Sequence, residues 1–155
     1  VLKGFFAGTT DSPVSYVNAP QLAEERGIEV RPTSTTTSLD YINLITIRAG
    51  EHAVAGTLVG LKSEPKVVMV DDHDVDITPA AHMIVVRNDD VPGMIGRIGT
   101  VVGAAGLNIA DMAVGRNSNG VAALQVMSVD RHPSDEVIAE LNALAGVVHA
   151  DRIDL

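Results

Sequence analysis

The stretch that decides the fold covers residues 82–93 and reads HMIVVRNDDVPG. Its first half contains the apolar run 83–86, which is short and apolar enough for a buried strand. Its second half, residues 88–93, is a polar turn that contains Pro92 and Gly93. A buried strand followed by such a turn predicts that the chain reverses here and enters a helix.

The residues after this turn have the spacing of a helix. We expect a helix from about Val91 to Ala105, ended by Gly106, because glycine is preferred just after a helix end. The apolar residues recur on one helical face, at Met94, Ile95, Ile98, Val101, Val102 and Ala105. This face is expected to pack on a sheet.

The remainder of the second half continues the pattern. Strands are expected at 108–115 and 121–129, joined by a hairpin turn at 117–120. A helix capped by Ser134 follows and ends at Gly146, and the last strand is 147–155. The order βαββαβ predicts an antiparallel four-stranded sheet with two helices on one face. The other face needs a cover, either a second copy of the chain or the neighbouring domain, so we expect a dimer.

The first 80 residues predict a smaller α+β unit. We expect the end of a helix at 1–8, a short helix from Ala19 to Arg26 capped by Asn18, a strand at 28–31, and a loop or edge strand at 32–38. A hairpin is expected from strands 41–48 and 52–59, and a second pair from 66–70 and 75–77. The fold class is therefore α+β, with units at 1–80 and 81–155. The opening elements of the first unit are expected to be missing, as in a fragment of a longer protein.

Composition restricts the classes of partner. The formal charge is −9, which opposes binding to nucleic acid or to an anionic membrane surface. The 155 residues include no cysteine, so disulfides and thiolate metal sites are excluded. No apolar run is long enough to span a bilayer and no export signal is recognised, so we expect a cytoplasmic location.

The turn at 88–93 offers complements to both charges of a zwitterion. A helix start presents backbone N–H groups and partial positive charge to a carboxylate, and Gly93 lets a ligand approach the backbone. Asp90 could accept a hydrogen bond from an ammonium group, or it could simply cap the helix. Asn108, expected beside this turn, could donate and accept, or could be an ordinary turn residue.

The sequence does not match the other chemical motifs that its acidic, histidine and glycine residues suggest. The acidic stretch 71–76 lacks the calcium-loop residues, because Ile77 and Met83 occupy the positions of the required Gly and Glu. The five histidines show no metal-ligand spacing, and the glycines at 93, 96 and 99 do not have dinucleotide-binding spacing. No arrangement of nucleophile and base is recognised. We therefore predict no catalytic, cofactor-binding or metal-binding residue in this chain.

Residues 88–96 and 106–110 resemble the ACT domain. With residues 13–20 and 54–58 added, nearly the whole chain resembles the C-terminal regulatory region of D-3-phosphoglycerate dehydrogenases that carry an intervening, allosteric substrate-binding domain. The resemblance implies a partial intervening domain at 1–80 and a ferredoxin-like ACT domain at 81–155. In this family Arg usually precedes the Pro-Gly pair, where this chain has Val91.

The resemblance also implies a function. L-serine would bind between paired ACT domains and inhibit NAD-dependent oxidation of 3-phosphoglycerate, with NAD held by domains that precede Val1. It implies a homo-oligomer, dimeric through ACT domains and possibly tetrameric in the full protein. An anionic effector is assigned to Lys66 and His73. The implied serine contacts are Asn88, Asp90, Asn108 and the backbone near Pro92, Gly93 and Met94.

Two other functions remain open at this point. Iron–sulfur L-serine dehydratases carry a related pair of domains, but the absence of cysteine and the segment 17–20 (VNAP) argue against them. The chain could also be a structural dimerisation module without a ligand. Glycine or another small amino acid is an alternative to serine as the ligand.

Overall fold

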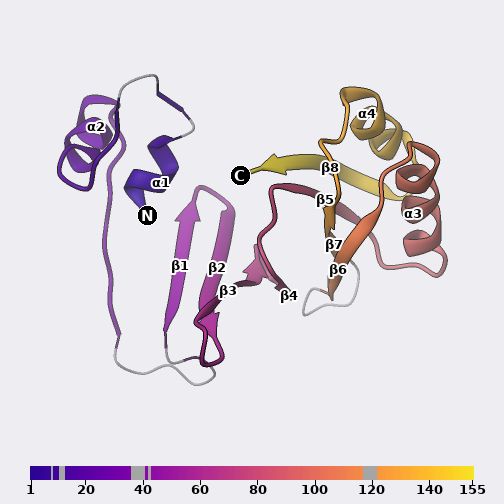
Figure 1. Cartoon of the computed structure of the whole chain (residues 1–155), viewed down its shortest axis with the longest axis horizontal. Helices are drawn as coiled ribbons and strands as arrows, with labels where there is room; N and C mark the ends of the chain where they lie inside the picture. Colours follow the sequence, from indigo (N-terminus) through magenta and orange to yellow (C-terminus); the bar gives the residue numbers. More distant parts are fainter. Residues whose placement is uncertain (8, 11–12, 36–40, 42, 117–121) are drawn as a thin grey trace. The chain divides into compact units, whose positions relative to one another are not determined.

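The computed structural model describes residues 1–155 except 8, 11–12, 36–40, 42 and 117–121 (Figure 1). The chain divides into two compact units, residues 1–40 and residues 41–155. The second unit contains two antiparallel sheets, and the boundary predicted between residues 80 and 81 lies within it. The predicted hairpin turn at 117–120 lies outside the described residues.

The first unit contains helices α1 (Leu2–Ala7) and α2 (Ala19–Glu25), with Phe6 buried among small residues of α2. Asn18 is the N-cap residue of α2, as predicted, but its side chain makes no capping hydrogen bond to the helix. Its Oδ1 instead accepts a hydrogen bond from the Ser15 N–H at 2.7 Å. The strand predicted at 28–31 is wrong, because residues 28–35 form no ladder with another described strand, and strand propensity alone does not supply one.

The first sheet consists of β1 (Leu44–Ala49), β2 (His52–Val59), β3 (Glu64–Val70) and β4 (His73–Ile77), in that order. All neighbours are antiparallel, so the two predicted strand pairs form one continuous meander. The turn between β3 and β4 is shorter than predicted and consists of Asp71 and Asp72. Asp71 adopts a positive φ of 54°, a conformation that Asp tolerates better than most residues.

The second sheet confirms the predicted βαββαβ order. Its elements are β5 (His82–Asp89), α3 (Met94–Ala104), β6 (Ile109–Arg116), β7 (Ala122–Val129), α4 (Asp135–Ala143) and β8 (Val147–Asp154). The strand order is β6-β7-β5-β8, which leaves β6 and β8 at the edges. Figure 1 shows both helices on one face of this sheet, and the core between them includes Ile84, Ile98, Val102, Met127 and Leu141. The α+β class and the ferredoxin-like ACT fold are thereby confirmed.

Helix α3 begins later than predicted. Its first residue is Met94 and its N-cap is Gly93, which has a left-handed φ of 89°. Because this conformation interrupts the helical backbone, Val91 and Pro92 belong to the preceding loop and are exposed. No helix in the described parts of the chain is both long and apolar enough to span a bilayer.

The second face of the βαββαβ sheet has its cover within the same chain. Val75 and Ile77 of β4 pack against Met83, Leu124 and Val126 on the face opposite the helices. The neighbouring sheet thus covers part of this face, whereas Ile153 of β8, which pairs with Met83, is still 43% exposed. The predicted dimer stays a prediction.

Candidate functional site

The β5–α3 loop, residues 90–93, is exposed or partly exposed and is held by backbone hydrogen bonds. The Asp89 N–H donates to the Gly146 carbonyl at 2.8 Å, and the Val91 N–H donates to the Asp89 carbonyl at 2.9 Å. A Cβ placed on Gly93 would meet no described atom within 4 Å, so the positive φ is what requires glycine here. The space beside Gly93 adjoins the first N–H groups of α3. These N–H groups have no hydrogen-bond partners within the helix.

Asp90 does not cap α3; that alternative is wrong, because Gly93 is the N-cap and the helix has no side-chain capping hydrogen bond. Its Oδ2 instead lies 2.8 Å from Nε of Arg116, at the end of β6. The Arg116 side chain is 72% exposed, whereas that of Asp90 is 20% exposed. The loop therefore combines a carboxylate, an accessible guanidinium and a helix start.

Asn88 lies at the end of β5 and is buried. Its Nδ2 donates to the Asp89 carbonyl at 2.7 Å, and its Oδ1 accepts from Nε2 of Gln125 at 3.0 Å. These bonds fix the backbone immediately before Asp90. The Met94 side chain is also buried, in the core under the helices, and its backbone N–H makes a long hydrogen bond, 3.4 Å, to the Val91 carbonyl.

Gln125 is a polar residue of this region that the sequence interpretation missed. It is 1% exposed, and its Oε1 has no hydrogen-bond partner in the described part of the chain. The signal was available, because Gln125 is the only amide in the strand AALQVMSV, whose other residues are apolar except for Ser128. Gln125 and Asn88 therefore place buried polar atoms, one of them an unpaired acceptor, at the end of the sheet next to the β5–α3 loop.

Asn108 lies away from the loop within a single chain. It precedes β6, whose first residue Ile109 pairs with Val129, whereas Asn88 and Arg116 both pair with Ala123 at the other end of β7. The prediction that Asn108 lies beside the loop is wrong for one chain, because α3 runs back along the full length of the sheet. Asn108 is exposed, and its N–H donates to Oδ1 of Asp130 at 3.0 Å, which lowers the pKa of Asp130.

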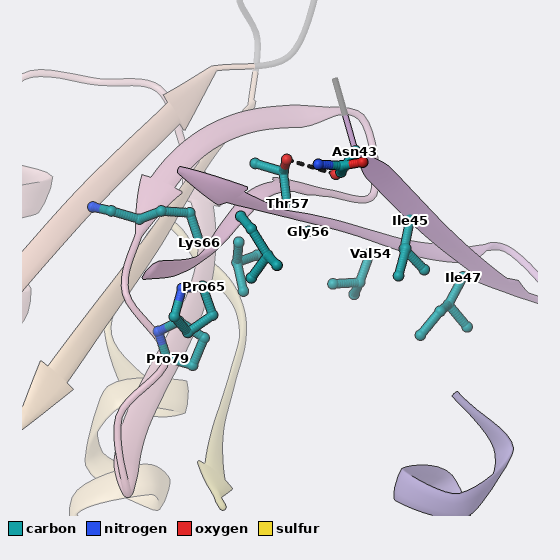
Figure 2. Close-up of a pocket in the computed structure, with 11 residues that line it drawn as sticks. Asn43, Ile45, Ile47, Val54, Gly56, Thr57, Pro65, Lys66 and Pro79 are labelled. Atoms are coloured by element: carbon teal, nitrogen blue, oxygen red, sulfur yellow. Dashed lines mark hydrogen bonds between the residues drawn. The ribbon is translucent and has the colours of Figure 1, made fainter. Parts of the chain in front are cut away.

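Lys66 lines an apolar hollow of about 340 Å³ on the first sheet (Figure 2). Its Nζ pairs with Oδ1 of Asp76 at 2.8 Å, and this bond raises the pKa of Lys66. Figure 2 shows the amino group directed away from Ile45, Ile47 and Val54, which form the wall of the hollow. The hollow is therefore apolar, and Lys66 is already paired at its margin.

His73 lines a different hollow, of about 310 Å³, together with His52, Asp71, Arg87 and others. It is 2% exposed, and neither ring nitrogen makes a hydrogen bond to a described residue, although Nδ1 is within ion-pair distance of Asp72, at 2.9 Å. Arg87 pairs with Asp71 through one terminal nitrogen, while its Nε has no described partner. Lys66 and His73 therefore do not form one site.

A βαββαβ sheet entered through a Pro-Gly turn defines the class of this protein: residues 82–146 match the ACT domain family. Residues 1–71 match the D-3-phosphoglycerate dehydrogenase intervening domain. The chain therefore belongs to the D-3-phosphoglycerate dehydrogenase family and corresponds to the regulatory region of its members.

Named relatives agree with this assignment. The D-3-phosphoglycerate dehydrogenase of Bacillus subtilis is 33% identical over 100% of this chain, and that of Archaeoglobus fulgidus is 32% identical over 100%. The enzyme of Synechocystis is 32% identical over 99% of the chain. The chain spans 30%, 30% and 28% of the length of these three relatives, respectively.

Proposed function

We propose that this chain is the regulatory part of an NAD-dependent D-3-phosphoglycerate dehydrogenase and that it binds L-serine, or a similar small amino acid, at the β5–α3 loop. One observation carries the proposal. At this exposed loop, the Asp90 carboxylate and the Arg116 guanidinium lie 2.8 Å apart, next to the start of α3. Both charges of an amino acid therefore have a complement at this loop, one from the loop itself and one from the end of β6.

The charges suit a zwitterion in a defined orientation. The ion pair uses one carboxylate oxygen of Asp90, and the ligand's ammonium group is assigned to the other. The ligand's carboxylate is assigned to the N–H groups that follow Gly93 and to Arg116. Arg116 thus supplies the guanidinium that related sequences carry at the position of Val91. Hydrogen bonds to charged groups contribute about 1.5–3 kcal/mol each, so a few of them suffice for micromolar to millimolar binding.

Asn108 completes the site only if two copies pair. Strand β6 is a sheet edge, and an antiparallel pairing of β6 with β6 of a second copy about a two-fold axis extends the sheet. That pairing brings the start of one β6, at Asn108, beside the end of the other, at Arg116. The proposal therefore includes a dimer with two equivalent sites, each made from both copies.

The parent protein is proposed to carry the NAD-binding and catalytic domains elsewhere in its sequence and to act in the cytoplasm. No residue of this chain is assigned to catalysis or to NAD. For an anionic effector of the intervening domain, the hollow at His73 offers Nε of Arg87, which is buried without a hydrogen-bond partner among the described residues. Three acidic residues, Glu51, Asp71 and Asp72, line the same hollow and disfavour an anion there.

Titration calorimetry with matched ligands tests the amino-acid site. L-serine should bind, while 3-hydroxypropanoate, which lacks the ammonium group, and ethanolamine, which lacks the carboxylate, should not. Asp90→Ala should abolish binding, whereas Asp89→Ala, an exposed acid one residue earlier, should retain it. Binding of either truncated ligand, or of L-serine to Asp90→Ala, contradicts the assignment. If no small amino acid produces a heat of binding, the result contradicts the proposed site and supports a dimerisation module without a ligand.

A further inference from the structure

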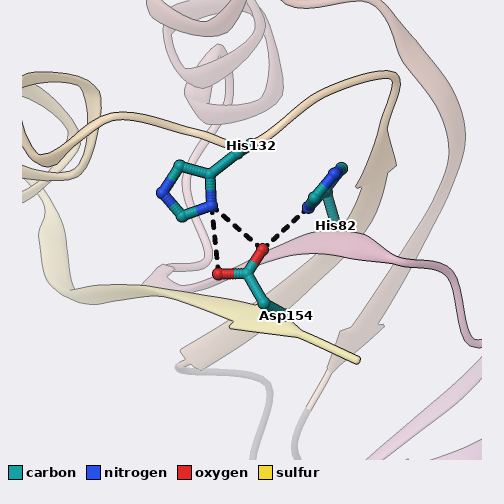
Figure 3. A group of neighbouring side chains, drawn as sticks. All are labelled: His82, His132 and Asp154. Atoms are coloured by element: carbon teal, nitrogen blue, oxygen red, sulfur yellow. Dashed lines mark hydrogen bonds and ion pairs between the residues drawn. The ribbon is translucent and has the colours of Figure 1, made fainter.

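A second cluster of chemically active side chains lies at the end of the βαββαβ sheet away from the β5–α3 loop. It consists of His82 at the start of β5, His132 between β7 and α4, and Asp154 at the end of β8 (Figure 3). One ligand atom from each residue lies within 4.8 Å of the other two. The three residues are far apart in the sequence, so their spacing gives no sign of the cluster.

The side chains converge on one point. Nδ1 of His82 is 2.8 Å from Oδ1 of Asp154, and Nδ1 of His132 is 3.1 Å from each carboxylate oxygen. The two imidazole rings lie edge to face with centroids 5.9 Å apart. A tetrahedral ion with bonds of about 2.0–2.1 Å holds its ligand atoms roughly 3.3 Å apart. The nitrogen–oxygen separations are close to that value, and all three ligand atoms lie within 4.8 Å of one another, so side-chain rotations can place them around one ion.

We propose that His82, His132 and Asp154 bind one divalent transition-metal ion of the Zn²⁺ type. Two imidazole nitrogens and one carboxylate oxygen are the donor set that Zn²⁺, Co²⁺ and Ni²⁺ accept, whereas Mg²⁺ and Ca²⁺ require oxygen ligands. The side chains of His132 and Asp154 are 53% and 41% exposed, so an ion can enter and water can complete its coordination. The ion then joins three separate segments of the ACT domain.

The positive charge of the neighbouring Arg152 disfavours a metal ion at this site, and the negative charge of Asp135 partly compensates that charge. Nε of Arg152 is 3.9 Å from Oδ2 of Asp154, and its guanidinium also pairs with Asp135. The positive charge of Arg152 is therefore shared between two carboxylates. The hydrogen bonds that both imidazoles make with Asp154 hold the two Nδ1 atoms toward the same point, which reduces the entropy lost when an ion binds.

Zinc titration of the tag-free, chelator-treated full chain tests the proposal. The wild type should bind one Zn²⁺ and its melting temperature should rise, because the ion binds the native state. His82→Ala, His132→Ala and Asp154→Asn should each weaken binding by more than about tenfold, since even loss of an outer-shell partner costs roughly 10–100-fold. His149→Ala, an exposed histidine of β8 outside the cluster, should bind as the wild type does, and Mg²⁺ should not bind.

Two results overturn the proposal: a wild type that does not bind Zn²⁺, or variants of His82 and His132 that bind as tightly as His149→Ala. Circular dichroism without metal establishes that each variant is folded. If the His82 variant fails to fold, His132→Ala decides alone, because its side chain lies largely in solvent. X-ray absorption of the zinc-bound wild type provides an independent test. Two imidazole ligands are expected, and fewer than two contradict the assignment.

Discussion

Nε of Arg116 lies 2.8 Å from Oδ2 of Asp90 across the exposed side of the β5–α3 loop. The two residues belong to segments separated by α3 and most of β6, and the sheet brings them together because Arg116 and Asn88 both pair with Ala123. The pair sets a positive and a negative group beside the start of α3. This arrangement is the basis of the amino-acid site proposed for the chain.

Replacing Arg116 should change the affinity for L-serine much more than it changes the stability of the fold. Arg116→Gln should weaken L-serine binding at least about tenfold, since it removes a charged hydrogen bond to the ligand. It should change the unfolding free energy by less than about 1 kcal/mol, because an exposed ion pair contributes little. Arg31→Gln is the matched control, as Arg31 forms a similarly exposed pair with Glu29, and neither residue belongs to the proposed site. Equal affinity of the two variants in calorimetry would remove Arg116 from the site.

The buried pair Asn88 and Gln125 should be energetically coupled. Gln125→Met removes the donor to Asn88 and leaves a buried acceptor unsatisfied, at a cost of about 1–3 kcal/mol. Asn88→Leu should cost a similar amount. In urea unfolding, the double variant should lose less than the sum of the two single losses. Strictly additive losses would mean that the hydrogen bond between them contributes nothing.

Gly115 tests the packing of β4 on the βαββαβ sheet. A Cβ at Gly115 would collide with the Asp74 carbonyl and lie 3.0 Å from Cβ of His73, so Gly115→Ala should destabilise the chain by about 1–3 kcal/mol. Gly103→Ala is the matched control, because its Cβ meets no described atom within 4 Å. As Gly103 lies in α3, alanine there should stabilise by up to about 1 kcal/mol. Similar melting temperatures for the two variants would contradict this packing.

Asp71 should give stability a specific dependence on pH. Burial raises the pKa of Asp71, but the Ala53 N–H and the charge of Arg87 outweigh that effect and hold the pKa below 3.8. Because the folded pKa is depressed, the contribution is complete above the unfolded pKa and is lost as the pH falls through the folded value. Asp71→Asn, which tolerates the positive φ, should therefore lower stability by about 1 kcal/mol at neutral pH and by less in strong acid.

The control for this prediction is Asp74→Asn, because Asp74 is exposed and its carboxylate makes no ion pair with a described residue. It should change stability little at any pH. Unfolding by urea at neutral pH and in acid measures both variants. A loss in Asp71→Asn that is equally large in strong acid would show that the carboxylate charge is not its cause.

Much of the fold could be predicted from local patterns. The alternation of strand and helix periods from residue 82 onward predicts the βαββαβ order, and Gly106 follows the C-cap of α3 with a positive φ, as predicted. Helix α4 ends earlier than predicted, at Ala143, because Leu144 is already extended, and Gly146 follows in the loop. The strand at 28–31 failed because a strand exists only with a partner, which local sequence does not reveal. The start of α3 was placed too early because apolar periodicity does not register the left-handed turn at Gly93.

The candidate site was predictable only in part. Pro92 and Gly93 predict a turn at residues 90–93, so the loop residues of the candidate site could be predicted from the sequence. The partnership of Asp90 with Arg116 and the distance of Asn108 from the loop depend on strand register, which sequence spacing does not encode. For the same reason His82, His132 and Asp154 showed no pattern, although the fold brings them together.

We propose that a free amino acid binds at the β5–α3 loop and is shared between two copies of the chain. Amide chemical shifts of the ¹⁵N-labelled chain, recorded during titration with L-serine, test this binding site. The largest shifts should occur at the backbone amides of Gly93, Met94 and Ile95 and at the side-chain amide of Asn108. Shifts confined to the apolar hollow around Ile45 and Val54, or no shifts at all, would contradict the claim.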